Sequence, residues 1–309
     1  MPTRTLGRTD LSIEPLVFGC NVLGWTLQEA DAYRVLDAYV DAGFTAFDTA
    51  DIYGKGASET ILGNWMKARG NRDTVLVFTK VGSDMGQGHR DLSAKWIEAE
   101  VDNSLRRLQT DRIDLYQSHW PDPNTPQEET LAAFDRLVEG GKVRFIGSSN
   151  QDGKLLQQAL TISRQEGIAR YETVQNEYNL YDRSDFEGPV QDICIREEVS
   201  GIGYFSLARG FLAGKYREAS DADKSPRGKG AVDKYLNERG KRILAALDTV
   251  AKRVNAKPAE VALAWINAQP GVGAPIASAT SVEQVASLVR GARLTLAAED
   301  VRELTEAGR

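Results

Sequence analysis

The chain has 309 residues, of which 41% are hydrophobic, enough for one large barrel or for two ordinary domains. Lys and Arg number 38 against 44 Asp and Glu, and the net charge of −6 predicts no basic surface for nucleic acid or anionic lipid. No window approaches the run of about 18 apolar residues that a membrane span requires, and the N-terminus lacks the apolar stretch of a secretion signal. We therefore expect a cytoplasmic protein that acts on a small molecule, with no nucleic-acid or membrane partner; its oligomeric state stays open.

The histidines and cysteines are few and scattered. His89 and His119 are the only histidines, and Cys20 and Cys194 show no CxxC spacing. A transition-metal site would have to rest almost entirely on carboxylates, which is an unusual catalytic arrangement. We expect no metal.

Strand and helix patterns alternate along the chain after a short hairpin at residues 4–14, where two strands flank a turn. The expected strands lie at 16–19, 44–48, 74–80, 113–119, 143–148, 171–175, 202–206 and 272–277, and the expected helices near 28–42, 57–69, 93–108, 127–139, 151–166, 189–199, 238–254, 258–268 and 299–306. Eight short apolar strands, mostly separated by helices, are typical of a closed parallel barrel. The sequence predicts an α/β fold, a (β/α)8 TIM barrel with an N-terminal β-hairpin and extra C-terminal helices.

No linker or shift in composition divides the chain, which favours one domain over residues 1–309. Residues 220–240 differ from the rest, because this polar stretch has too little apolar content for a core element. We expect a mobile loop there, at the rim of the active site.

Three of the predicted strands end in polar side chains suited to proton chemistry. Asp48 ends the first of them and Tyr53 follows closely; Lys80 and His119 end the next two strands. The carboxyl ends of parallel barrel strands share one rim, so these four side chains are expected to meet over one pocket.

A carbonyl that accepts hydride needs a proton donor and a second group that orients its oxygen. Tyr53 is the natural donor, and a nearby Lys80 cation would favour the phenolate and ease proton transfer. Asp48 would hold Lys80 in its protonated form. His119 could orient the substrate oxygen or share the acid role at low pH, and the sequence leaves both options open.

Each of these residues also fits a role without chemistry: Asp48 as a turn cap, Tyr53 as a loop aromatic, Lys80 as a solvated strand end and His119 as packing. Isolated matches carry little information. Their joint placement on three successive strand ends favours catalysis.

The motifs Asp48-Thr-Ala-Asp-Ile-Tyr53-Gly, Thr79-Lys80 and Tyr116-Gln-Ser-His119 together resemble the Asp, Tyr, Lys and His tetrad of the aldo-keto reductases, and the similarity runs through nearly the whole chain. The resemblance implies an NAD(P)H-dependent oxidoreductase that reversibly reduces aldehyde or ketone carbonyls to alcohols. Hydride would come from the nicotinamide and the proton from Tyr53.

The resemblance also implies how the cofactor is held. Ser149, Asn150 and Gln175 match the family's ligands of the nicotinamide carboxamide, and Tyr204 matches the tyrosine that stacks on the nicotinamide ring. The stretch after Tyr204 resembles the segment that approaches the pyrophosphate, and its matching residues are Leu207, Arg209 and Gly210.

One segment departs from the family pattern. Ser278, Thr280 and Gln284 stand where many relatives place Lys or Arg on the 2′-phosphate of NADPH, and neutral groups lack the strength of a charge-assisted hydrogen bond. NADP(H) is the expected cofactor from family habit, and NAD(H) stays open. Cations from residues 220–240 could compensate; the candidates are Lys224, Arg227 and Lys229.

Trp25, Trp120 and Tyr53 would give the pocket an aromatic, apolar lining, which favours aldehydes or ketones with apolar or aromatic groups. Two other functions stay open. The first is a redox-sensing nicotinamide-binding module similar to the β subunits of potassium channels. The second is a lyase that uses Lys80 as a Schiff-base nucleophile.

Overall fold

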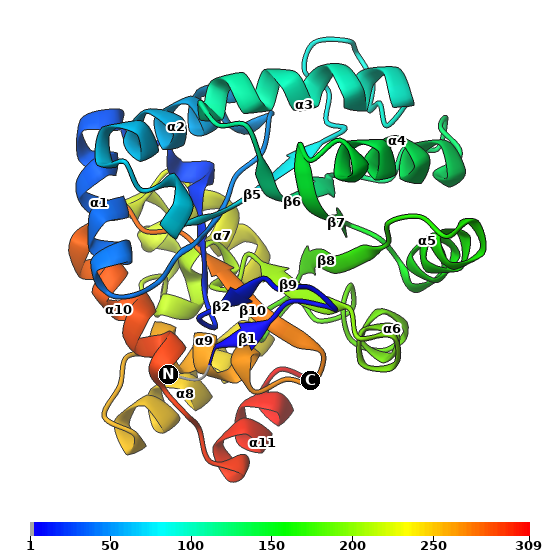
Figure 1. The fold of residues 1–309 in the computed structure, drawn as a ribbon. Coiled ribbons are helices and arrows are strands. Elements are labelled where there is room, and N and C mark those ends of the chain that lie inside the picture. The colour runs from blue at the N-terminus through cyan, green and yellow to red at the C-terminus, as the bar shows by residue number, and fades with distance from the viewer. Residues whose placement is uncertain (1–2) are drawn as a thin grey trace.

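The computed structural model describes residues 3–309 of the chain. Within these residues, eight parallel strands form a closed barrel in the order β10, β3, β4, β5, β6, β7, β8, β9 (Figure 1). Their bounds are Val17–Gly19 (β3), Ala46–Asp48 (β4), Leu76–Val81 (β5), Ile113–Ser118 (β6), Val143–Ser149 (β7), Tyr171–Glu177 (β8), Ser200–Tyr204 (β9) and Val272–Ala277 (β10). The expected (β/α)8 barrel is confirmed.

Helices follow the strands and surround the barrel in Figure 1. Those between the strands are Glu29–Asp41 (α1), Ala57–Arg69 (α2), Ala94–Leu108 (α3), Gln127–Glu139 (α4), Gly153–Glu166 (α5), Pro189–Glu197 (α6), Gly228–Tyr235 (α7), Glu238–Arg253 (α8) and Pro258–Asn267 (α9). Val282–Arg293 (α10) and Ala298–Ala307 (α11) follow the last strand. The sequence patterns left out two of these helices, α7 and α10. None of the helices described is both long enough and apolar enough to cross a bilayer.

Side-chain caps and prolines fix where several helices begin. The side chains of Ser93 and Asp152 accept hydrogen bonds from backbone N–H groups in the first turns of α3 and α5, and Asn237 does the same for α8. Pro258 occupies the first turn of α9, where its missing N–H costs nothing. These local signals explain why the helix boundaries could be predicted closely.

The predicted hairpin consists of β1 (Arg4–Thr5) and β2 (Ser12–Ile13), which pair antiparallel. Its apolar side chains Leu6, Leu11 and Ile13 are almost completely buried and join the cluster of side chains inside the barrel. The hairpin therefore closes the amino end of the barrel, and the carboxyl ends of the strands stay open for a site.

The expectation that residues 220–240 are too polar to form a core element was wrong. The short 3-10 helix Ala219–Lys224 and helix α7 occupy most of this stretch. Ala231 and Tyr235 are fully buried, and the Tyr235 O–H donates a 2.7 Å hydrogen bond to Asp182. Two well-placed side chains thus anchor a mostly polar sequence; its mobility stays a prediction.

Candidate active site

A cavity of about 1010 Å³ opens at the carboxyl ends of the barrel strands. Every predicted site residue except Lys80 lines it: Trp25, Asp48, Tyr53, His119, Trp120, Ser149, Asn150, Gln175, Tyr204, Leu207, Arg209, Gly210, Ser278, Thr280 and Gln284. Residues more than 250 positions apart in sequence are therefore brought to one surface. Lys80 is fully buried next to this surface.

Lys80 lies on β5 beside Asp48, the last residue of β4. Its ammonium donates to Asp48 Oδ1 at 2.6 Å, to the Thr49 carbonyl at 2.7 Å and to the Tyr53 oxygen at 3.3 Å. Burial by itself would lower the pKa of Lys80, but Asp48 and Tyr53 outweigh it and raise the pKa above its ordinary value. A buried, protonated amine with three partners is poorly placed to attack a carbonyl, so this geometry does not support the Schiff-base alternative.

Tyr53 begins the short 3-10 helix Tyr53–Gly56 soon after β4, and it links the buried Lys80 to the cavity, because it contacts the Lys80 ammonium and lines the cavity. Burial raises the pKa of Tyr53, and the Lys80 ammonium only partly offsets this effect. Lys80 by itself lowers the pKa of Tyr53, as expected. Burial has the larger effect, so the pKa of Tyr53 is raised and not lowered.

His119 follows the last residue of β6. Its Nδ1 lies 3.0 Å from the Ser83 hydroxyl, and its ring meets the Tyr53 ring edge to face at 5.8 Å. Burial lowers the pKa of His119 well below 6.5, and the positive charges of Lys80 and Arg90 lower it further. The imidazole is therefore neutral, which goes against the low-pH acid role and leaves orientation of the substrate oxygen.

The second carboxylate oxygen of Asp48 has partners of its own. Gln175 Nε2 donates to it at 2.8 Å and Gln117 Nε2 at 3.3 Å, so amides from two further strands hold the carboxylate in place. Gln117 was absent from the predicted site. Side chains alternate along a strand, and a residue two positions before His119 shares its side of the sheet, so this period could have identified Gln117.

The predicted carboxamide ligands form one hydrogen-bonded group. The Ser149 hydroxyl donates to the Gln175 carbonyl at 2.7 Å, and the Asn150 amide donates to the His119 carbonyl at 2.8 Å. The Tyr204 hydroxyl donates to Asn150 Oδ1 at 2.8 Å. Asn150 itself has a left-handed backbone, with φ of 57°. These contacts join the ends of β6, β7, β8 and β9 around the cavity.

The loop after β9 carries strained backbone. Phe205, Ala208 and Arg209 have φ values of 50°, 47° and 57°, which cost about 1 to 3 kcal/mol each and persist only where surrounding contacts impose them. The Nε of Arg209 is buried and has no hydrogen-bond partner among residues 3–309. A buried, unpaired guanidinium N–H suits a phosphate oxygen, so this loop fits the pyrophosphate of a dinucleotide.

The segment that departs from the family pattern, residues 278–284, contains no Lys or Arg that could bind a phosphate. Thr280 donates to Gln284 Oε1 through its backbone N–H at 2.9 Å and through its hydroxyl at 3.3 Å. Ser278 donates to Asn21 Oδ1 at 2.8 Å. The neutral side chains at this end of the cavity thus form hydrogen bonds with other neutral groups.

Cations reach the cavity from other elements. Of the three predicted compensating residues, only Arg227 lines the cavity, whereas Lys224 and Lys229 pair with Asp221 at 2.6 Å and with Asp233 at 2.9 Å. The sequence patterns missed two further lining cations, Lys215 and Lys257. No local signal marks Lys257 as a site residue, because it is simply the residue before the α9 proline.

The two predicted substrate-side tryptophans lie at the mouth. Trp25 is 50% exposed, and the Arg227 guanidinium lies 5.0 Å from its ring. Trp120 stacks on the His119 ring, and the Arg90 guanidinium lies 4.5 Å from the centre of the Trp120 ring. Both tryptophans line the cavity, so its mouth has the expected aromatic character.

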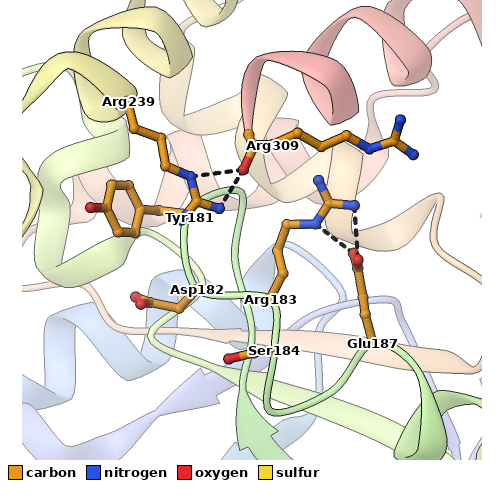
Figure 2. Close-up of a pocket in the computed structure, with 8 residues that line it drawn as sticks. Tyr181, Asp182, Arg183, Ser184, Glu187, Arg239 and Arg309 are labelled. Carbon is orange, nitrogen blue, oxygen red and sulfur yellow. Dashed lines mark hydrogen bonds and ion pairs between the residues drawn. The ribbon is translucent and has the colours of Figure 1, made fainter.

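A second, smaller cavity of about 410 Å³ lies among charged side chains (Figure 2). Arg183 pairs with Glu187 at 2.7 Å, and the Arg239 guanidinium donates to the Gly308 carbonyl at 2.9 Å. The Arg239 contact joins α8 to the end of α11, and none of the predicted site residues lines this cavity. Among residues 3–309, no three His, Cys, Asp or Glu side chains are grouped to hold a metal ion.

Comparisons with known proteins agree with this geometry. The aldo/keto reductase family model matches residues 15–309. The aldo-keto reductase YhdN of Bacillus subtilis is 34% identical over 98% of this chain and 92% of its own length, and the uncharacterized oxidoreductase YrpG of the same organism is 33% identical over 97% and 94%. The aldo-keto reductase yakc [NADP(+)] of Schizosaccharomyces pombe is 31% identical over 99% and 91%. The chain belongs to the aldo/keto reductase family, a family of oxidoreductases that use nicotinamide cofactors.

Proposed function

We propose that this protein is an NAD(P)H-dependent reductase that reversibly converts aldehyde or ketone carbonyls to alcohols, with Tyr53 as the proton donor. The observation that carries the proposal is the position of Tyr53, which lines the cavity while its hydroxyl lies 3.3 Å from the buried Lys80 ammonium. A phenol between a cation and an open cavity suits proton delivery to an oxygen that gains negative charge.

Each tetrad residue has a separate task. Tyr53 gives its proton to the substrate oxygen, and Lys80 stabilises the phenolate that remains. Asp48 balances the charge of Lys80 at 2.6 Å, so that the buried ammonium stays protonated. His119, neutral and at the cavity wall, donates a hydrogen bond to the same oxygen and orients it.

The residues present fit a nicotinamide cofactor. Ser149, Asn150 and Gln175 offer hydroxyl and amide groups for a neutral carboxamide, and the Tyr204 ring is available for stacking. When bound, the nicotinamide would supply the hydride. Leu207, Arg209 and Gly210 would hold the pyrophosphate, with the unpaired Arg209 Nε as donor. With the cofactor and the tetrad so placed, the substrate would bind at the mouth of the cavity.

The preferred cofactor is NADP(H). Lys215, Arg227 and Lys257 line the cavity, and their charged side-chain groups form no ion pair among the described residues, which leaves them free to bind a 2′-phosphate. They can supply the charge that Ser278, Thr280 and Gln284 lack, and one relative carries NADP(+) in its name. Burial and the positive charge of Arg209 lower the pKa of Arg227. A bound anion would therefore stabilise the charged form of this guanidinium.

Fluorescence titration with NADPH and NADH tests this preference. We expect NADPH to bind more than about tenfold more tightly, the gain of one charge-assisted contact. Replacing Lys215, Arg227 or Lys257 with Met, one at a time, should lower the NADPH affinity in at least one variant and leave the NADH affinity of that variant unchanged. Equal affinities for both cofactors in the unaltered protein would contradict the NADP(H) assignment.

The substrate should carry an apolar or aromatic group, because Trp25 and Trp120 line the mouth. Substituted benzaldehydes and aliphatic aldehydes are suitable probes for kcat/KM.

Tyr53→Phe tests the proton donor. This variant keeps the ring and removes the hydroxyl, so turnover should fall by about 10³-fold while cofactor binding stays within about twofold. Turnover close to that of the unaltered protein would contradict the assignment. Turnover that is very slow in the unaltered protein as well, together with tight cofactor binding, would favour the redox-sensing alternative.

A further inference from the structure

The two ring nitrogens of His119 face different surroundings. Nδ1 lies 3.0 Å from the Ser83 hydroxyl, within a buried contact. Nε2, on the opposite edge of the ring, has no hydrogen-bond partner among residues 3–309, and His119 lines the cavity. One edge of the imidazole is therefore anchored in the protein, and the other is left for a ligand.

The ring is also fixed in its plane. It stacks on Trp120, with 6.0 Å between ring centres and an interplanar angle of 17°. The His119 backbone N–H donates to the Val81 carbonyl at 2.8 Å, and Asn150 donates to the His119 carbonyl at 2.8 Å. These contacts hold the ring in place, and the hydrogen bond with Ser83 selects the orientation in which Nδ1 faces that residue.

The protonation of this ring decides what it can do for a substrate. The surroundings of His119 keep it neutral, and a neutral imidazole carries a single N–H. If that hydrogen is on Nδ1, the cavity-facing Nε2 can only accept a hydrogen bond. If it is on Nε2, the ring can donate to a carbonyl oxygen.

Ser83 discriminates between the two tautomers. Its side chain is only 6% exposed, and His119 Nδ1 is the single hydrogen-bond partner of its hydroxyl among the described residues. With the hydrogen on Nδ1, the hydroxyl would accept, and its own proton would be buried without a partner, which costs free energy. With the hydrogen on Nε2, the hydroxyl donates to Nδ1 and both groups are satisfied.

We propose that Ser83 is a positioning residue that holds His119 in the tautomer with its hydrogen on Nε2, ready to donate to the substrate carbonyl oxygen. No bond forms or breaks at His119 in this role, because the proton that the oxygen receives comes from Tyr53. Ser83 is not among the residues that line the cavity, so it acts only through His119. The identity of the acceptor rests on the proposed function, whereas the tautomer itself does not.

Nitrogen-15 NMR of the imidazole rings tests the tautomer without any turnover. The chain has two histidines, and a His89→Gln variant leaves the signals of His119 alone. At pH 8, Nδ1 should resonate as an unprotonated nitrogen and Nε2 as a protonated one. A protonated Nδ1 would overturn the proposal.

Variants of Ser83 connect the tautomer to turnover. Ser83→Ala should bring the two nitrogen shifts closer together, because both tautomers become populated, and lower kcat roughly tenfold, the factor that one ordinary hydrogen bond supplies. Cofactor affinity should stay unchanged, since Ser83 does not touch the cavity.

Ser83→Thr and Ser83→Val form a matched pair, because they have nearly the same shape and differ in the hydroxyl. The Thr variant should keep the nitrogen pattern and most of kcat, and the Val variant should lose both. A Val variant with the unaltered nitrogen pattern and kcat would overturn the proposal. Absence of carbonyl reduction in the unaltered protein would contradict the proposed function instead, and the NMR result would still decide the tautomer.

Discussion

Both ends of the barrel contain a buried aspartate that is paired with a cation from a neighbouring element. At the amino end, Asp114 accepts from Arg72 at 2.9 Å and from Arg144 at 2.8 Å. At the carboxyl end, Asp48 accepts from Lys80 at 2.6 Å. Both aspartates are 2% exposed, so burial and pairing alone do not separate a structural site from a candidate catalytic one.

The difference lies in what surrounds each pair. The amino-end pair lies at the end that the hairpin closes, and Arg144 also pairs with Asp10 of that hairpin. The carboxyl-end ammonium donates a hydrogen bond to Tyr53, which lines a large cavity. A buried ion pair by itself is weak evidence for function. It indicates a functional site where it contacts a titratable group that a ligand can reach.

Lys80→Met should have the largest effect. It leaves the buried Asp48 without its cation, so the free energy of unfolding should fall by about 3 to 5 kcal/mol. It also removes the charge that favours the phenolate, and kcat should fall by about 10³-fold. Urea denaturation and steady-state kinetics measure the two effects.

Arg72→Met is the matched change at the amino end. Asp114 keeps Arg144 and the Val77 N–H, which donates at 2.9 Å, so stability should fall by less, about 1 to 3 kcal/mol. kcat should stay within about twofold of the unaltered protein, since a structural pair supplies no transition-state interaction. A loss of kcat similar to that of Lys80→Met would break the comparison.

Gln117 offers a smaller and sharper test at the carboxyl end. Gln117→Leu removes a 3.3 Å donor from Asp48, so kcat should fall by roughly tenfold or less, as for one ordinary hydrogen bond. Gln117→Glu should be worse, because a second carboxylate beside Asp48 competes for the Lys80 charge. The reverse order of the two variants in steady-state kinetics would show that packing, and not charge, is what Gln117 supplies.

His119 should make the protein less stable in acid. The pKa of His119 in the folded protein is well below 6.5. As pH falls below 6.5, the unfolded chain therefore binds a proton at this residue and the folded protein does not. Stability that is present above about pH 6.5 is therefore lost as pH falls, by at most about 1.4 kcal/mol for each pH unit below that value. Urea denaturation at pH 7.5 and 5.5 measures the loss, which should be smaller in His119→Gln. Equal losses in both proteins would contradict a neutral, buried His119.

The parts of the site that the sequence predicted are those that strand geometry fixes. Asp48, Lys80 and His119 lie at or next to the carboxyl ends of β4, β5 and β6, and parallel strands in a barrel bring these ends together. The contact between Ser83 and His119 depends on how the loop after β5 folds back, which no sequence pattern indicates.

Other features depended on balances or distant contacts. The pKa of Tyr53 results from burial and from Lys80 acting in opposite directions, and only the structure gives the extent of burial. Helix α7 has a polar sequence, and its last residue, Tyr235, is anchored by a hydrogen bond to Asp182, which is distant in sequence. Lys257 reaches the cavity through the arrangement of α9, which periodicity does not specify.

The Asp48 carboxylate has a consequence for how the molecule acquires its chemistry. Its partners come from β5, β6 and β8, so the carboxylate is fully bound only once most of the barrel has closed. A truncated chain that stops before β8 would contain all four tetrad residues and still lack the Gln175 amide. Assembly of the barrel and the gain of activity should thus be a single event, and a split or permuted version of this chain would regain turnover only when its pieces reunite into the whole ring.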